Sequence, residues 1–68
     1  MMRREVVYFR EVEQEDGTKK LQGNISNGKI IFPDKDATTK VKPKKYYDCL
    51  IHETSNTAFA RDIKDWKL

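Results

Sequence analysis

The chain has 68 residues and a formal net charge of +3, and hydrophobic and charged residues each make up 37% of it. This length allows one small core, which favours a single domain over residues 1–68. It leaves little material to wall off the deep pocket that most enzymes need, so we expect a binding protein and not an enzyme.

The first predicted strand covers residues 5–13, "EVVYFREVE", which is rich in the Val, Tyr and Phe that favour strands. Side chains alternate between the two faces of a strand, so Val7 and Phe9 are expected to share one face. The other face carries Val6, Tyr8 and Val12. A strand that is apolar on both faces is typical of a barrel or of a sheet that a partner covers.

Two glycine-containing pairs, at 16–17 (Asp-Gly) and 27–28 (Asn-Gly), predict tight hairpins with positive φ angles. Between them, residues 21–26 alternate apolar and polar side chains and predict the second strand. Gly23 falls on its inward face, where the missing side chain permits a close backbone approach or a sharp bend. Residues 29–32, "KIIF", predict the third strand.

Pro33 cannot donate to a strand ladder and is expected to end the third strand. The following segment, 33–41, is predicted as a link without a true helix, because it is short and holds two β-branched Thr residues. Residues 46–53 predict a fourth strand and residues 57–63 a fifth, which follow the period-two pattern. One face of the fourth strand carries Tyr47, Cys49 and Ile51.

Helical periodicity is absent throughout, so the sequence predicts an all-β fold. Five short strands, with two tight hairpins in the first half, fit a five-stranded antiparallel barrel that is OB-like or SH3-like. Closure into a barrel also removes exposed strand edges. We expect the aromatic part of its core to consist of Phe9, Phe32, Tyr47 and Phe59.

Positive charge gathers in residues 35–45, which hold five lysines and one aspartate, whereas residues 1–18 hold three basic and five acidic residues. We hypothesise that this stretch binds the phosphate backbone of a nucleic acid while an exposed tyrosine stacks on a base. The candidate residues are Lys35, Lys40, Lys42, Lys44, Lys45 and Tyr46. The alternative is a solvated lysine-rich corner that keeps a small β protein soluble.

A second hypothesis from a different class is a module that binds another protein or forms a homodimer. It depends on the second apolar face of the first strand and on the aromatic residue near the end of the chain. The candidate face consists of Val6, Tyr8, Val12 and Trp66.

Metal and thiol chemistry are not expected. Cys49 and His52 lie three positions apart on a predicted strand, which turns their side chains to opposite faces. A zinc site needs about four ligands, and the chain offers one Cys and one His. We therefore expect a buried core thiol, no metal and no cofactor. A lone cysteine and the lack of a secretion signal indicate a cytoplasmic protein, and no apolar stretch is long enough to predict a membrane partner.

Residues 40–63, "KVKPKKYYDCLIHETSNTAFARDI", resemble the closing hairpin of TRAM and related OB-type modules. The likeness consists of a basic corner with Val and Pro, the alternating strand "YYDCLI" and a last strand that contains "AFA", and it covers about a third of the chain. The chain differs from these modules in lacking a Gly-rich "GxGxA" segment. TRAM modules are small RNA-binding barrels, so the resemblance implies a barrel and RNA, ahead of DNA, as the partner.

Overall fold

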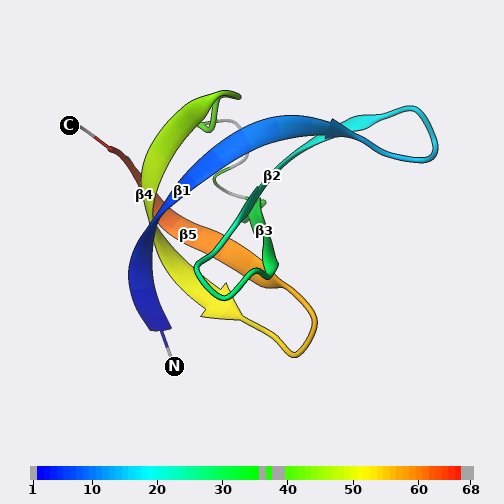
Figure 1. Cartoon of the computed structure of the whole chain (residues 1–68). Coiled ribbons are helices and arrows are strands. Elements are labelled where there is room, and N and C mark those ends of the chain that lie inside the picture. Colours follow the sequence, from blue (N-terminus) through cyan, green and yellow to red (C-terminus); the bar gives the residue numbers. More distant parts are fainter. Residues whose placement is uncertain (1, 36, 38–39, 67–68) are drawn as a thin grey trace.

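The computed structural model describes residues 2–35, 37 and 40–66, and these residues form five strands. The strands are β1 (Met2–Glu13), β2 (Lys19–Asn24), β3 (Ile30–Pro33), β4 (Lys45–Glu53) and β5 (Ala58–Asp65). They close into a barrel in the order β1-β2-β3-β5-β4, with β4 beside β1 (Figure 1). The predicted all-β fold and the five-stranded barrel are confirmed. Within the described ranges, no helix is long and apolar enough to span a membrane.

One strand pair corrects the predicted antiparallel barrel: β3 and β5 run parallel, whereas the other four pairs are antiparallel. The parallel pair places Ile31 beside Ala58 and Phe32 beside Phe59. It arises because the link after Pro33 carries the chain across to β1, where β4 pairs, and β5 then fills the gap between β3 and β4. Local alternation of side chains carries no information on which strands pair, so the sequence did not reveal this.

The link between β3 and β4 contains turns where the structure describes it. The Ala37 N–H donates to the Asp34 carbonyl (2.9 Å), and the Lys40 N–H donates to the Ala37 carbonyl (3.0 Å). Asp36, Thr38 and Thr39, which belong to the predicted link, lie outside the described residues.

Both predicted hairpin turns are present, and each has its positive φ at the glycine: 88° at Gly17 and 90° at Gly28. The Gly17 N–H donates to the Gln14 carbonyl (3.0 Å) and the Gly28 N–H to the Ile25 carbonyl (2.9 Å). The residue before each glycine keeps a negative φ, so the turns are three-residue loops that end in a left-handed glycine.

Gly23 permits a close contact between β2 and β1, so of the close approach and the sharp bend that the sequence left open, the structure shows the close approach. A Cβ atom at this position would lie 2.6 Å from Val7 Cγ1 and 2.7 Å from the Tyr8 carbonyl oxygen. Because one of these atoms belongs to the backbone, a larger residue cannot be accommodated by a side-chain rotation alone. β1 pairs with two strands along its length: residues 2–9 pair with β4, and its last four residues, 10–13, pair with β2.

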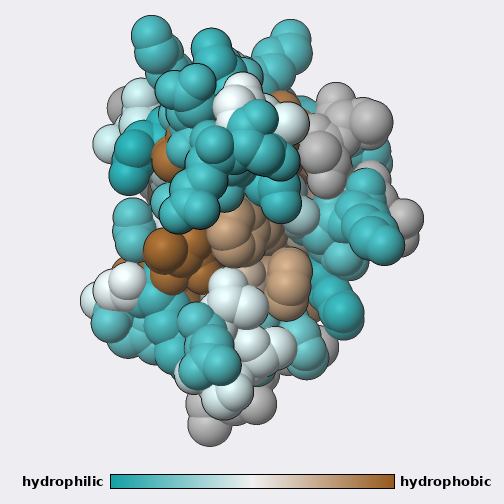
Figure 2. Space-filling view, turned by 90° about the vertical axis from the view of Figure 1, so that its right-hand side faces the viewer, coloured by the Kyte–Doolittle hydropathy of each residue, from teal (hydrophilic) through white to brown (hydrophobic). Residues whose placement is uncertain are grey.

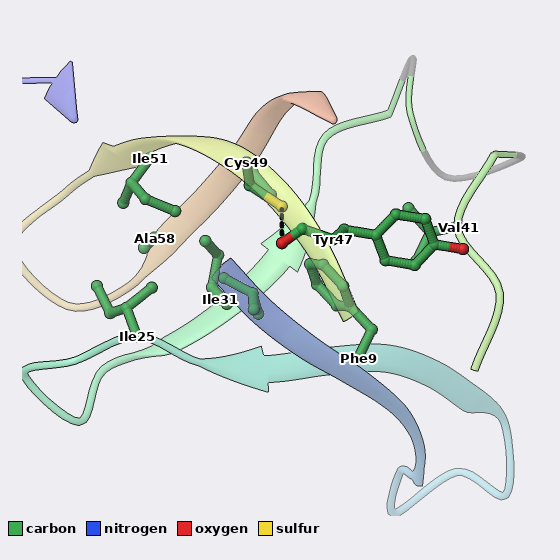
Figure 3. Packing of buried hydrophobic residues seen from close by; sticks show 10 residues of the cluster. Phe9, Ile25, Ile31, Val41, Tyr47, Cys49, Ile51 and Ala58 are labelled. Carbon is green, nitrogen blue, oxygen red and sulfur yellow. Dashed lines mark hydrogen bonds between the residues drawn. The ribbon is translucent and has the colours of Figure 1, made fainter. Parts of the chain in front are cut away.

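The core lies inside the barrel and includes most of the predicted inward side chains (Figure 3). Val7, Phe9, Tyr47, Cys49 and Ile51 are all buried, as expected. The Cys49 thiol points to the Tyr47 carbonyl oxygen at 3.7 Å. These residues come from β1 and β4, which share the longest register of any strand pair in the barrel.

Two aromatic residues that were expected in the core lie elsewhere: Phe32 and Phe59 are only half-buried. Ile31 fills the inward position on β3, which turns Phe32 outward. On β5 the inward positions belong to the small residues Ala58 and Ala60, which turns Phe59 outward. The prediction was wrong because, on each of these two strands, it assigned the larger of two neighbouring side chains to the core.

A cluster of charged and polar side chains ties the start of β1 to the β2–β3 turn and to the end of β4. We call it the charge cluster, and it consists of Arg3, Glu5, Ser26, Asn27 and Glu53. Arg3 contacts Glu5 (Nε to Oε2, 2.7 Å) and Glu53 (Nη2 to Oε1, 3.2 Å). Glu5 also accepts hydrogen bonds from the Ser26 N–H (2.9 Å) and hydroxyl (3.1 Å), and Glu53 accepts one from the Asn27 amide (2.6 Å).

Candidate nucleic-acid interface

An apolar groove of about 690 Å³ runs along the outside of the barrel where β2, β3 and the start of β5 lie. Its apolar lining consists of Leu21, Phe32, Pro33 and Phe59. Figure 2 views the side of Figure 1 toward which these strands lie and shows apolar side chains between hydrophilic ones above and below. A volume of this order is within the range of ligand-binding sites.

The parallel pairing of β3 and β5 places the two outward phenylalanines beside each other. Phe32 and Phe59 are register partners, and adjacent strands lie about 4.8 Å apart. Both side chains are half-buried, so each exposes part of its surface to the groove. Two neighbouring rings on a strand surface form a platform on which flat groups such as nucleobases can stack.

Three lysines edge the groove: Lys19 and Lys20 at the start of β2, and Lys35 just after β3. All three are exposed, and no carboxylate in the described ranges lies within salt-bridge distance of their ammonium groups. One carboxylate, that of Glu11, also lines the groove. The groove thus combines an apolar floor with an excess of cations.

The structure distributes the lysines of the sequence-predicted site over several places. Lys35 lines the groove, Lys44 lines a second hollow, and Lys40 lines a third beside Arg61 of β5. The Lys45 ammonium lies 3.4 Å from a carboxylate oxygen of Asp65. The remaining residue, Lys42, is exposed. Three of the lysines that are close together in sequence therefore line different hollows.

The second hollow lies over β1, next to an exposed aromatic pair. The rings of Tyr8 and Tyr46 are cross-strand partners whose centroids lie 4.8 Å apart at an angle of 51°. Tyr8 is 39% exposed and Tyr46 is 53% exposed, which confirms the predicted outward direction of both. Lys44 reaches this place through a left-handed backbone conformation (φ 62°), and its N–H donates to the Phe9 carbonyl (2.8 Å).

The predicted protein-interaction face is brought together in part. Val6 (42% exposed) lies two positions before Tyr8 on β1, so both project outward on the same side of the strand. Val12 is half-buried near the other end of β1, where it pairs with Lys20, and Trp66 (42% exposed) follows the end of β5. A role of these residues in protein contact stays a prediction.

Cys49 is a core residue, as the sequence predicted. Burial raises the pKa of its thiol to about 12, which disfavours the thiolate that nucleophilic chemistry requires. His52 lies three positions along the strand and is half-buried. In the part of the chain that the structure describes, no group of three or more His, Cys, Asp or Glu side chains is placed to hold a metal ion.

Sequence reasoning missed most of the groove: Lys19, Lys20, Leu21, Phe32 and Phe59 were not among the predicted site residues. The two lysines stand outside the densest charge run, at the start of β2, and only the fold brings them near Lys35. The small residues on either side of Phe59 in "TAFARDI" were the one available signal. Small side chains suit the interior of a narrow barrel, and they leave the phenylalanine between them to point outward.

In comparisons with known proteins, no family model, no curated protein and no solved structure matches this chain. The resemblance of residues 40–63 to TRAM modules therefore stays a prediction. The geometry of the groove is what bears on function.

Proposed function

We propose that this protein binds single-stranded nucleic acid, with RNA as the preferred partner, in the groove between β2, β3 and β5, and that it does so in the cytoplasm without a catalytic step. In this proposal Phe32 and Phe59 stack on bases, and Lys19, Lys20 and Lys35 contact phosphates.

The arrangement of the strands supports an OB kind of barrel over an SH3-like one. β5 inserts between β3 and β4, which is a Greek-key order and not a simple meander. OB barrels bind oligonucleotides on the face of their second and third strands, next to the loops that follow the first and fourth strands. The groove lies on that face, between the β1–β2 hairpin and Thr57, which precedes β5.

The chemistry of the groove matches a flexible polyanion with flat bases. Stacking on aromatic side chains tolerates any base and contributes about 1–3 kcal/mol per base, and lysines supply a salt-dependent attraction to the backbone. The observation that carries the proposal is the pair of register partners Phe32 and Phe59 beside three lysines that have no carboxylate of the described residues within salt-bridge distance. Lysines act as point charges, so we expect little sequence preference.

The test compares two triple variants that remove the same charge. The first changes the groove lysines Lys19, Lys20 and Lys35 to Gln. The second changes Lys40, Lys42 and Lys64 to Gln, three exposed lysines that do not line the groove. Binding of fluorescent oligouridylate and oligothymidylate is measured by anisotropy at several salt concentrations, and folding is checked by thermal unfolding.

The groove variant is expected to lose most of its affinity and to lower the slope of log K against log salt by about 2, since each phosphate contact to a single strand contributes about 0.7. The matched variant is expected to keep that slope. A larger loss in the matched variant would place the site on the β3–β4 link, and no binding by the unaltered protein at low salt would refute the proposal. A preference for oligothymidylate would refute RNA as the partner.

A further inference from the structure

We infer that the bound strand continues from the groove across β1 to the pair Tyr8 and Tyr46, so that one longer single strand occupies two separate stacking sites. The inference rests on the proposed function and deepens it, because it defines the ligand as a strand long enough to reach both sites. We call the Phe32 and Phe59 platform the first site and the Tyr8 and Tyr46 pair the second site.

The two sites are connected by a shared surface. Glu11 of β1 and Lys19 of β2 line both the groove and the second hollow, and the second hollow extends to Tyr8. A strand that leaves the groove over Lys19 therefore passes into the second hollow, with a cation for its phosphate at the crossing.

The second site has the same two ingredients as the first. Tyr8 and Tyr46 expose their rings and contact each other, and neither hydroxyl has a hydrogen-bond partner in the described part of the chain. Arg10 and Lys44 line the hollow beside them, and within the described ranges neither lies in salt-bridge distance of a carboxylate. Exposed rings with free cations beside them are the arrangement that single-strand binders use.

The balance of charge makes the second site the weaker one. Glu13 lines the second hollow in addition to the shared Glu11, so two carboxylates oppose a phosphate there and only one does so in the groove. A short oligonucleotide is therefore expected to occupy the groove alone. A longer one gains the second site as an intramolecular contact, which raises its affinity without a change in the groove.

Self-association through the same tyrosines is the competing use of this surface. The centre of a homodimer interface is depleted of Lys and Glu, whereas the surroundings of Tyr8 hold both types. Nucleic acid is the occupant whose phosphates would pair with Arg10 and Lys44, which have no salt bridge to any described carboxylate, and we commit to it.

The experiment measures affinity for oligouridylates of about three and about nine nucleotides, the longer within the roughly 4–16 nucleotides that one OB barrel covers. Tyr46→Thr removes the ring from an exposed strand position and retains a residue that suits strands. Tyr46→Phe keeps the ring, and Trp66→Leu removes an exposed aromatic residue that lines neither hollow. Phe59→Leu removes a ring from the first site.

Tyr46→Thr is expected to weaken binding of the longer strand about tenfold, the effect of one lost stacking contact, and to leave the trimer unchanged. Tyr46→Phe and Trp66→Leu are expected to bind both lengths normally, and Phe59→Leu to weaken both. Lys44→Gln provides a second probe that leaves the aromatic pair intact: it should lower the salt slope for the longer strand alone, by about 0.7.

An equal effect of Tyr46→Thr on both lengths, or no effect on either, would overturn the second site while the proposed function stands. A change from dimer to monomer in light scattering, without a change in affinity, would assign the tyrosines to self-association and would also overturn it. Absence of binding at either length by the unaltered protein would instead refute the proposed function.

Discussion

The charge cluster and the groove are both rich in charged side chains, but they differ in whether those charges are paired. In the charge cluster Arg3 lies between two carboxylates, and each carboxylate also accepts hydrogen bonds from the β2–β3 turn. In the groove, Lys19, Lys20 and Lys35 have no carboxylate within salt-bridge distance among the residues that the structure describes.

The difference separates charges that stabilise the fold from charges that remain available to a ligand. A paired charge has its attraction satisfied within the protein, so it holds strands together and offers little to an outside anion. An unpaired lysine beside an apolar floor contributes little to the free energy of unfolding and retains its full attraction for a phosphate. Substitutions in the two regions should therefore affect different measurements.

Acidification should distinguish the two regions most strongly, because it protonates the carboxylates that hold the charge cluster together. Burial alone would raise the pKa of Glu5, but the hydrogen bonds from the Ser26 N–H, Arg3 and the Ser26 hydroxyl outweigh it and lower the pKa. The hydrogen bonds from Arg3 and then from Asn27 lower the pKa of Glu53. Lowered carboxyl pKa values mean that the stabilisation is complete above the ordinary glutamate pKa of about 4.3 and is lost as the pH falls through the folded-state values.

We therefore expect the free energy of unfolding in urea to be constant with respect to these two groups from pH 7 to about pH 5 and to fall below about pH 4.3. The decline should be shallower in Glu5→Gln, which cannot titrate at this position. Glu15→Gln, a change of the same type in the exposed β1–β2 turn, should keep the full slope. An identical slope in all three proteins would show that the charge cluster does not contribute to acid unfolding.

Glu5→Gln at neutral pH should have the next largest effect, and it should act on stability alone. The neutral amide cannot accept hydrogen bonds from both Arg3 and the Ser26 N–H as the carboxylate does. The loss of one charge-assisted hydrogen bond at a half-buried position lowers the free energy of unfolding by about 1 kcal/mol. For a domain of this size that corresponds to a decrease in Tm of about 4–8 °C. Calorimetry measures the shift, with Glu15→Gln as control, and oligouridylate affinity should not change. A loss of affinity without a loss of stability would reverse the roles of the two regions.

Glu11→Gln should have the smallest effect, and in the opposite direction, since Glu11 is the carboxylate that both hollows share. Removing one negative charge near a bound phosphate should raise the affinity for the longer oligonucleotide about twofold, which matches an exposed charge contact of roughly 0.5 kcal/mol. Glu15→Gln makes the same change in net charge but lines neither hollow, so it should have a smaller effect. Equal gains in both variants would mean that only the overall charge matters and not the path of the strand.

Several features of the fold followed from the sequence because they depend on neighbouring residues. The turns at Gly17 and Gly28 and the end of β3 at Pro33 rest on backbone properties of the residue itself, and the inward direction of Gly23 follows from the alternation of residues 21–26. The buried face of β4 followed from strict alternation. The buried faces of β3 and β5 did not follow from the sequence, because both "KIIF" and "TAFARDI" have apolar residues on both faces of the strand. Alternation alone therefore did not decide which face is buried, and the prediction relied on residue size.

The sequence by itself determined that this chain turns back at two glycines and forms short strands around one small core, since φ preferences and alternation act over a few residues. Only the tertiary structure decided that β5 runs parallel to β3, that Phe32 and Phe59 face outward together, and that Lys19 and Lys20 lie near Lys35. Those outcomes depend on which strands pair across the closed barrel, and pairing between residues far apart in the chain is set by the packing of the whole core and not by any local pattern.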